Sequence, residues 1–188
     1  MQEPIESDEA IASRVQSGDG EAFGILMERY QSKLGRYGRG FLKSEDDIAE
    51  VVQDVFVNAY RNIKGFDARK RFSPWIYRIA HNAFANELRR RSRHPFALPD
   101  FDTLLAHTVA PERAEDEAER REWKELAARA LGMVSSVHQE ILSLFFLEEL
   151  SYKEIADVLR IPVGSVGVRL SRAKRALRAA LPAVPPPL

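Results

Sequence analysis

Apolar residues recur along this chain at the three- and four-residue spacing that places them on one face of an α-helix. The clearest case is the stretch 46–62, where polar residues occupy the opposite side. Its apolar stripe consists of Ile48, Val51, Val52, Val55, Phe56, Ala59 and Tyr60. No stretch alternates between apolar and polar residues as a half-buried strand does. The pattern therefore predicts an all-α fold.

Two further helices are predicted before residue 46. One covers 8–16, and a turn at Gly18-Asp19-Gly20 separates it from the next. The second helix begins near residue 22, and Leu34, Tyr37 and Phe41 extend it. Its apolar face starts with Ala22, Phe23, Leu26, Met27 and Tyr30. Ser44, followed by acids, predicts a capped start for the helix over 46–62.

A basic loop and another helix follow residue 62. Lys64 to Phe72 interrupts the helical pattern, and Ser73 as N-cap with Pro74 at the first helical position predicts a restart. This helix ends in an arginine-rich segment that finishes at Arg93. Its predicted apolar face is Trp75, Ile76, Ile79, Ala80, Ala83, Phe84 and Leu88.

Prolines and acids interrupt the helical pattern over 96–118, which predicts a linker. The chain is thus expected to form two small helical bundles, 1–95 and 119–182, on a flexible acidic tether. The Pro-rich segment 183–188 is expected to be a disordered tail.

The stretch 150–181 has the pattern of a helix-turn-helix. Ser151 and Glu154 form a capping box, and Ala156 is small where the first helix approaches the second. Pro162 suits the first position of the second helix, which has basic residues and no acids. Its apolar stripe is Val166, Leu170, Ala173, Leu177 and Leu181. A packing unit without DNA is the alternative, and this combination of features favours a recognition helix.

Net charge is zero, but the charges are segregated. Residues 60–93 hold ten Lys and Arg against two acids, and 160–178 hold six against none. Residues 96–123 hold eight acids against three bases. Two basic blocks suggest two polyanion-binding faces, with solvated helix surfaces as the alternative. The first block interleaves aromatic residues, which suits single-stranded nucleic acid. The spacing of Trp75 favours a core position, whereas Phe66 could equally belong to the core or bind nucleic acid.

Composition argues against an enzyme. The chain has no Cys, its four His lack metal-ligand spacing, and it has no glycine-rich phosphate loop. We therefore expect no catalytic residue, no metal, no cofactor and no small-molecule substrate. His81 is expected to be exposed, and Glu148-Glu149 to face solvent. An acidic start and the lack of a long apolar run predict a cytoplasmic protein without a signal peptide or membrane insertion.

Taken together, these segments resemble the extracytoplasmic-function sigma factors of the sigma-70 family, over roughly residues 8–93 and 120–181. The stretches that carry the resemblance are 18–23 with Tyr30, 46–56, 72–82, and 162–166 with 169–173. The middle domain of larger sigma factors is replaced here by the acidic linker. The resemblance implies a protein that binds core RNA polymerase, through its β′ coiled coil and β flap, and directs transcription initiation at promoters. An anti-sigma factor is an implied regulator.

The resemblance also implies roles for individual residues. The polymerase-docking face would be Glu50, Gln53, Asp54 and Asn58. The minus-ten element would be bound by Lys64, Phe66, Asp67, Arg69, Lys70, Arg71, Phe72, Arg78, Asn82 and Arg89. The minus-thirty-five element would be read by Ser165, Val168, Arg169, Ser171, Arg172 and Arg175. The linker would follow the RNA exit path, where its acids imitate the transcript.

One segment departs from the family pattern. Gly167 and Val168 stand where the family commonly has a Lys or Arg followed by Ser. Gly167 would let the backbone approach DNA, and Val168 would touch a thymine methyl group. Two other functions remain open: a helix-turn-helix regulator that binds duplex DNA as a dimer, and an adaptor that binds an acidic protein.

Overall fold

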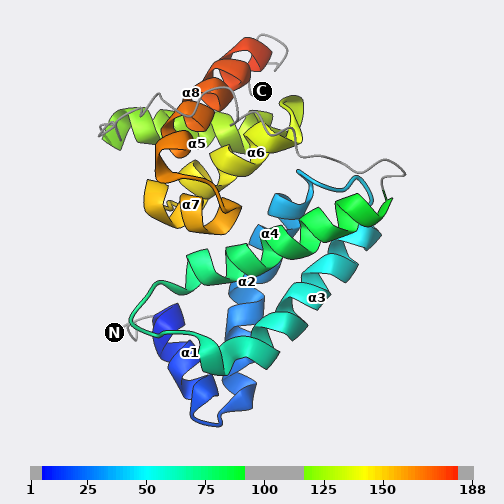
Figure 1. Cartoon of the computed structure of the whole chain (residues 1–188), viewed down its shortest axis with the longest axis vertical. Coiled ribbons are helices and arrows are strands. Elements are labelled where there is room, and N and C mark those ends of the chain that lie inside the picture. The colour runs from blue at the N-terminus through cyan, green and yellow to red at the C-terminus, as the bar shows by residue number, and fades with distance from the viewer. Residues whose placement is uncertain (1–5, 92–116, 182–188) are drawn as a thin grey trace, which may run out of the picture. The chain divides into compact units, whose positions relative to one another are not determined.

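The computed structural model describes residues 6–91 and 117–181, and in these residues it contains α-helices and short helical turns but no strand (Figure 1). The chain divides into two compact units, 1–93 and 94–188. We call them the first and second unit and describe each separately. Most of the predicted linker 96–118 and all of the predicted tail 183–188 lie outside the described residues.

The first unit contains four α-helices in the part of it that the structure describes. They are α1 (Asp8–Gln16), α2 (Phe23–Gly38), α3 (Glu45–Asn62) and α4 (Phe72–Arg91). Short 3₁₀ turns at Gly20–Ala22 and Ile63–Gly65 precede α2 and follow α3. The helices predicted for 8–16 and 46–62 are confirmed, and the Ser44 hydroxyl caps α3 by accepting a bond from the Asp47 amide at 3.3 Å.

Aromatic side chains fill the core of the first unit, where α2, α3 and α4 meet. Tyr37 lies edge-on to Tyr77, with ring centroids 5.2 Å apart, and also contacts the ring of Phe84. A Cβ atom at Gly38 would lie 2.5 Å from the Phe84 ring, so only glycine fits this position at the end of α2. The close approach therefore depends on the glycine.

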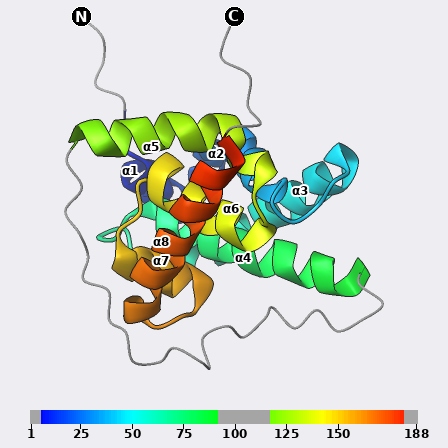
Figure 2. The same cartoon turned by 90° about the horizontal axis from the view of Figure 1, so that it is seen from above.

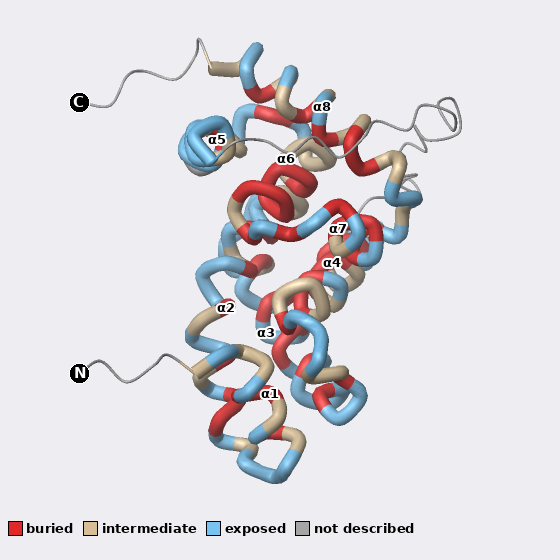
Figure 3. The backbone as a smooth tube through the Cα atoms, turned by 90° about the vertical axis from the view of Figure 1, so that its left-hand side faces the viewer, coloured by how far each residue is buried: buried red, intermediate tan, exposed pale blue. Residues whose placement is uncertain are grey.

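The second unit contains α5 (Glu117–Ala130), α6 (Ser136–Leu142), α7 (Tyr152–Leu159) and α8 (Val163–Ala180). The segment Ser143–Leu147 continues α6 as a π-helix. Figure 2 shows α8 crossing α6, and the tube in Figure 3 shows the buried stripe of α8. The capping box of α7 is confirmed, since Ser151 and Glu154 each bond the other's backbone amide.

Cation–π contacts connect α8 to α5 at Trp123, whose side chain is buried. The Lys174 ammonium lies 4.7 Å and the Arg178 guanidinium 4.5 Å from the centre of its indole ring. The Phe146 ring stacks on the same indole at 5.8 Å. Two cations of α8 thus contribute to packing within the unit.

Several expectations about polar and apolar positions are wrong. His81 is buried rather than exposed, because it lies on the face of α4 that contains Tyr77 and Phe84, and its ring contacts Phe41. Glu148 is buried in the turn after the π-helix, whereas Glu149 is exposed. Met27 and Tyr60 were expected on buried stripes but are 40% and 49% exposed. Tyr60 lies at the edge of the core, against Phe23.

Three helix starts also differ from the prediction, and α2 ends at Gly38, before Phe41. Helix α4 begins at Phe72, so Ser73 lies inside it and is not its N-cap. Pro162 occupies the N-cap position of α8 and not its first helical position. Helix α5 begins at Glu117, within the predicted linker. None of the described helices combines the length and the apolar character that a membrane span requires.

Candidate nucleic-acid interface

The loop between α3 and α4 presents a cluster of cations. Lys64, Arg69, Lys70 and Arg71 are all exposed. Asp67 shapes the loop by accepting a bond from the Arg69 amide at 3.1 Å and two from its guanidinium at 2.9 and 3.0 Å. These bonds lower the pKa of Asp67 to about 2. Asp67 therefore remains ionised and neutralises part of the basic surface.

The two phenylalanines of this loop region do not have free faces. Phe66 is 5% exposed and Phe72 is fully buried, with ring centroids 5.4 Å apart. Trp75 contacts both rings, at 5.2 and 5.4 Å. Phe66 and Phe72 were expected to bind the minus-ten element together with the polar residues of the loop. Their burial corrects this expectation, because their rings support the loop from the core side.

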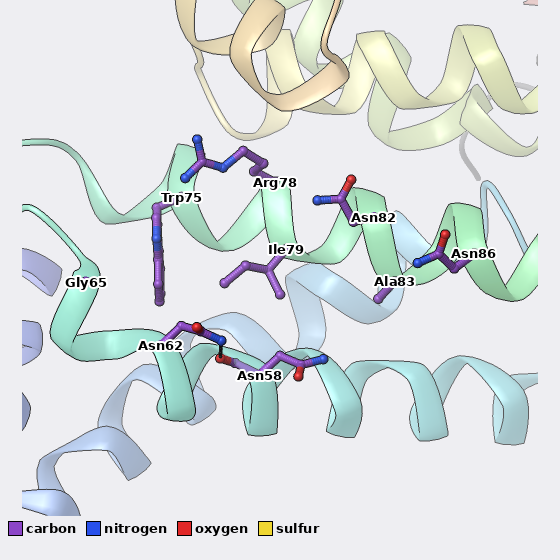
Figure 4. Close-up of a pocket in the computed structure, with 9 residues that line it drawn as sticks. All are labelled: Asn58, Asn62, Gly65, Trp75, Arg78, Ile79, Asn82, Ala83 and Asn86. Carbon is purple, nitrogen blue, oxygen red and sulfur yellow. Dashed lines mark hydrogen bonds between the residues drawn. The ribbon is translucent and has the colours of Figure 1, made fainter.

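A groove of about 430 Å³ lies between the C-terminal half of α3 and the middle of α4 (Figure 4). Trp75 and Ile79 point from α4 toward α3 and form its apolar part, with Ala83. Its polar groups are the guanidinium of Arg78 and four amides, from Asn58, Asn62, Asn82 and Asn86. Amides offer both donors and acceptors, so the groove can bond base edges while the indole offers a ring for stacking.

The groove explains why the predicted apolar face of α4 was partly wrong. Ile76, Ala80 and Phe84 are buried as expected, but Trp75, Ile79 and Ala83 are only half-buried and line the groove. Sequence reasoning assigned Trp75 to the core and did not identify Asn62 or Asn86. A signal was available, since the amides occur as two pairs at the i, i+4 spacing that places residues on one helix face.

The arginines at the end of α4 are largely paired within the unit. Arg90 makes two bonds of 2.7 Å to Glu87, and Arg91 pairs with both Glu87 and Asp47. These cations lower the pKa of Glu87 to about 2, and the two carboxylates raise the pKa of Arg91. Arg89, the predicted DNA contact, bonds the Asn86 side chain at 2.7 Å. Arg78, by contrast, is an exposed cation that lines the groove.

The polar side of α3 is exposed at all four predicted positions, Glu50, Gln53, Asp54 and Asn58. Asn58 differs from the others because it also lines the groove. The remaining three form an acidic and amide surface on α3, which we call the α3 polar face.

Helices α7 and α8 form the predicted helix-turn-helix. Arg160 ends α7 in the left-handed conformation, with φ of 55°, and lets the chain reverse into α8. Val166, Leu170, Ala173 and Leu177 are buried, which confirms those positions of the stripe. Gly167 is buried too, which contradicts its expected close approach to DNA.

The six predicted duplex contacts of α8 lie outside its buried stripe. Ser171 and Arg175 are exposed, and Ser165, Val168, Arg169 and Arg172 are half-buried. Arg172 acts electrostatically on His138 of α6. Burial is the main cause that lowers the pKa of His138, and the Arg172 charge adds to it. His138 therefore stays neutral beside the arginine.

The fold and these surfaces define a class: an all-α, two-unit DNA-binding protein with a helix-turn-helix in its second unit and a basic, amide-lined groove in its first. Comparisons with known proteins identify the family. The family model for Sigma-70 region 2 matches residues 26–94, and that for Sigma-70 region 4 matches 124–177.

Full-length relatives agree with both matches. The ECF RNA polymerase sigma-E factor of Haemophilus influenzae is 33% identical over 177 residues, which cover 89% of this chain and 92% of the relative. The same factor of Escherichia coli K12 is 33% identical over 178 residues, with 91% and 92% covered. The structure of CnrH in complex with the cytosolic domain of CnrY is similar with a TM-score of 0.65 and 29% identity, over 96% of this chain and 100% of that one.

The chain belongs to the sigma-70 family and is of the extracytoplasmic-function type. As an RNA polymerase sigma factor, it binds core polymerase and directs promoter-specific transcription initiation. The first unit corresponds to region 2 and the second to region 4.

Proposed function

We propose that the two units divide promoter recognition between a melted strand and intact duplex. In the region 2 unit, the groove between α3 and α4, together with the loop from Lys64 to Phe72, holds the unpaired minus-ten strand. In the region 4 unit, α8 enters the major groove at the minus-thirty-five element. The α3 polar face docks on the β′ coiled coil of core polymerase, and the region 4 unit contacts the β flap.

The groove is the observation that carries this proposal. It combines an indole, four amides and an exposed guanidinium within one cavity, and Gly65 of the loop, which follows the exposed Lys64, also lines it. Duplex DNA offers base edges only in its grooves, whereas an extruded base offers its whole Watson–Crick edge and a ring face. The chemistry of the cavity therefore matches an unpaired base.

The energetic need supports the same assignment. Extruding a base costs a few kcal/mol, and stacking on an aromatic side chain returns about 1–3 kcal/mol per base. Phosphate contacts from the loop cations add a sequence-independent contribution. Because Asp67 pairs with Arg69, we expect Lys64 and Lys70 to supply much of this contribution.

Asn82→Ala tests the groove. Promoters are first recovered by run-off transcription from genomic fragments with core polymerase and this protein. Holoenzyme with Asn82→Ala should then bind a premelted promoter fragment about tenfold more weakly, since one side-chain contact to a base edge is worth about 1–3 kcal/mol. The control is Gln31→Ala, which removes an exposed amide of α2 outside the groove.

The two outcomes are distinct. Equal binding by Asn82→Ala and the control would contradict the groove assignment. A loss of core binding by Asn82→Ala would contradict the division between the groove and the α3 polar face.

We also propose that an anti-sigma factor regulates this protein. CnrH, the relative in the similar structure, is bound there to the cytosolic domain of CnrY. Three large apolar side chains of the region 2 unit, Met27, Val57 and Tyr60, are 40%, 39% and 49% exposed, and they offer apolar contact area to such a partner. A purified partner that competes with core polymerase for this chain would support the proposal, and one that binds without competing would contradict it.

A further inference from the structure

The loop that we assign to the minus-ten strand is held at both ends by side chains of α1. The first contact is made by Gln16, the last residue of α1. Its amide nitrogen donates to the carbonyl oxygens of Ile63 and Phe66, both at 2.7 Å. One amide group carries two N–H donors, so a single side chain satisfies both carbonyls where the chain leaves α3.

The second contact is made by Glu9, at the other end of the same loop. Its carboxylate accepts a bond from the backbone amide of Phe72 at 2.8 Å. Phe72 is the first residue of α4, where amides have no partner within the helix. A carboxylate is also favoured there by the helix dipole. Glu9 thus caps α4 from a different helix, in the role that the sequence had assigned to Ser73.

Helix α1 is itself fixed firmly in the region 2 unit. Ile11, Ala12 and Val15 are buried, and the Ser7 side chain caps its start. Asp8 bonds the Arg29 guanidinium at 2.6 Å and accepts a bond from the Tyr30 hydroxyl at 2.7 Å. Because α1 is attached to α2 in this way, Gln16 and Glu9 hold the loop against a rigid support.

We propose that Gln16 and Glu9 are positioning residues for the minus-ten loop, and that α1 is therefore part of the strand-reading apparatus. Both residues lie outside the stretch 26–94 that the family model matches. The inference rests on the proposed function of the loop. Its physical basis is preorganisation: a loop fixed at both ends before it meets the strand loses less conformational freedom on binding.

The proposal is tested with Gln16→Ala and Glu9→Ala, and Ser13→Ala is the matched control. Ser13 lies on α1. The bond described for its hydroxyl is donated to the backbone carbonyl of Glu9, within the same helix. Glu9→Gln is a rescue variant, since its side-chain carbonyl can still accept the bond from Phe72.

The first measurement needs no DNA. Hydrogen exchange of the loop amides in the full chain should become about tenfold faster in Gln16→Ala, because a net hydrogen bond is worth about 0.5–1.5 kcal/mol and two are lost. Ser13→Ala should leave this exchange unchanged, and Glu9→Gln should resemble wild type. Unchanged exchange in both alanine variants would overturn the positioning role.

The second measurement is sequence discrimination by holoenzyme. It compares binding of a premelted promoter fragment with binding of the same fragment after its minus-ten bases are replaced. We expect the ratio of the two binding constants to fall about fivefold in Gln16→Ala and Glu9→Ala. A loosened loop should lose contacts to the bases that are worth about one net hydrogen bond. Equal weakening on both fragments would indicate general destabilisation and overturn the proposal.

A loop variant separates this inference from the function on which it rests. Arg69, Lys70 and Arg71 are changed together to Ala. If this variant binds the premelted fragment as tightly as wild type, the loop does not hold the strand, and the proposed function of the loop fails. If it binds that fragment more weakly while Gln16→Ala and Glu9→Ala retain full discrimination, only the positioning role of α1 is wrong.

Discussion

The region 2 unit and the region 4 unit place their candidate DNA surfaces on different kinds of support. In region 2 the groove is assembled from α3 and α4, and the adjoining loop is bonded to α1. In region 4 the predicted contacts all lie on the single helix α8. The same helix uses two other cations, Lys174 and Arg178, to pack on Trp123.

This difference has a consequence for how each surface can change. A substitution at Trp75 in the groove also alters the core, because Trp75 touches the buried rings of Phe66 and Phe72. Ser171 and Arg175, by contrast, are exposed on α8 and can vary while Val166 and Leu170 keep the core intact. Region 4 is therefore the unit in which specificity can be altered at the smaller cost in stability.

The largest effect that we expect is on polymerase binding, from a substitution that lies outside both candidate DNA surfaces. Asp54→Arg reverses the charge at the centre of the α3 polar face, where Asp54 is exposed. Core polymerase binding should weaken at least about a hundredfold, because like charges placed across an interface cost several kcal/mol. Circular dichroism should show an unchanged fold.

The matched control for this reversal is Glu21→Arg, which makes the same change of charge at an exposed residue outside α3. If Asp54→Arg binds core polymerase as wild type does, the α3 polar face is not the docking surface. The surface that joins the two units to the polymerase would then lie elsewhere on the protein.

A smaller effect is expected from Arg172→Ala on α8. Holoenzyme should bind an intact duplex promoter about tenfold more weakly, because one arginine contact to DNA is worth about 1–3 kcal/mol. Core binding should not change. Arg129→Ala, which removes an exposed arginine of α5, is the control. Equal losses of promoter and core binding would contradict a purely DNA-contacting role for α8.

The two units also differ in how much of their structure the sequence predicts. The fold class, the capping box and the stripe of α8 were predictable because helical periodicity and capping depend on residues that are close in the chain. The α8 surface followed from the same stripe. His81 could also have been placed correctly, since it lies four residues after Tyr77 and three before Phe84, both of which are buried.

The groove and the loop contacts could not be predicted in this way. Trp75 has the spacing of a core residue, and only the packing of α3 beside α4 places it at a groove. Gln16 bonds Ile63 and Phe66, 47 and 50 residues away, and Glu9 bonds Phe72 at a separation of 63. One sequence contains no periodic signal for such contacts, because they depend on how distant segments pack.

The smallest effect concerns pH and is confined to region 4. Burial, and then the charge of Arg172, lower the pKa of His138 in the folded protein. The unfolded chain therefore binds more protons than the folded chain as pH falls through about 6.5, the ordinary pKa of histidine. The stability that neutral His138 contributes is present above that pH and is lost below it.

Two measurements check this expectation. The urea midpoint should fall slightly more between pH 8 and pH 5.5 in wild type than in His138→Gln, which has no group to protonate. In Arg172→Ala, NMR titration should show the pKa of His138 rising toward its ordinary value but remaining below it, because burial is the larger cause. An unchanged pKa in that variant would mean that Arg172 does not face His138, and that α8 presents this arginine elsewhere.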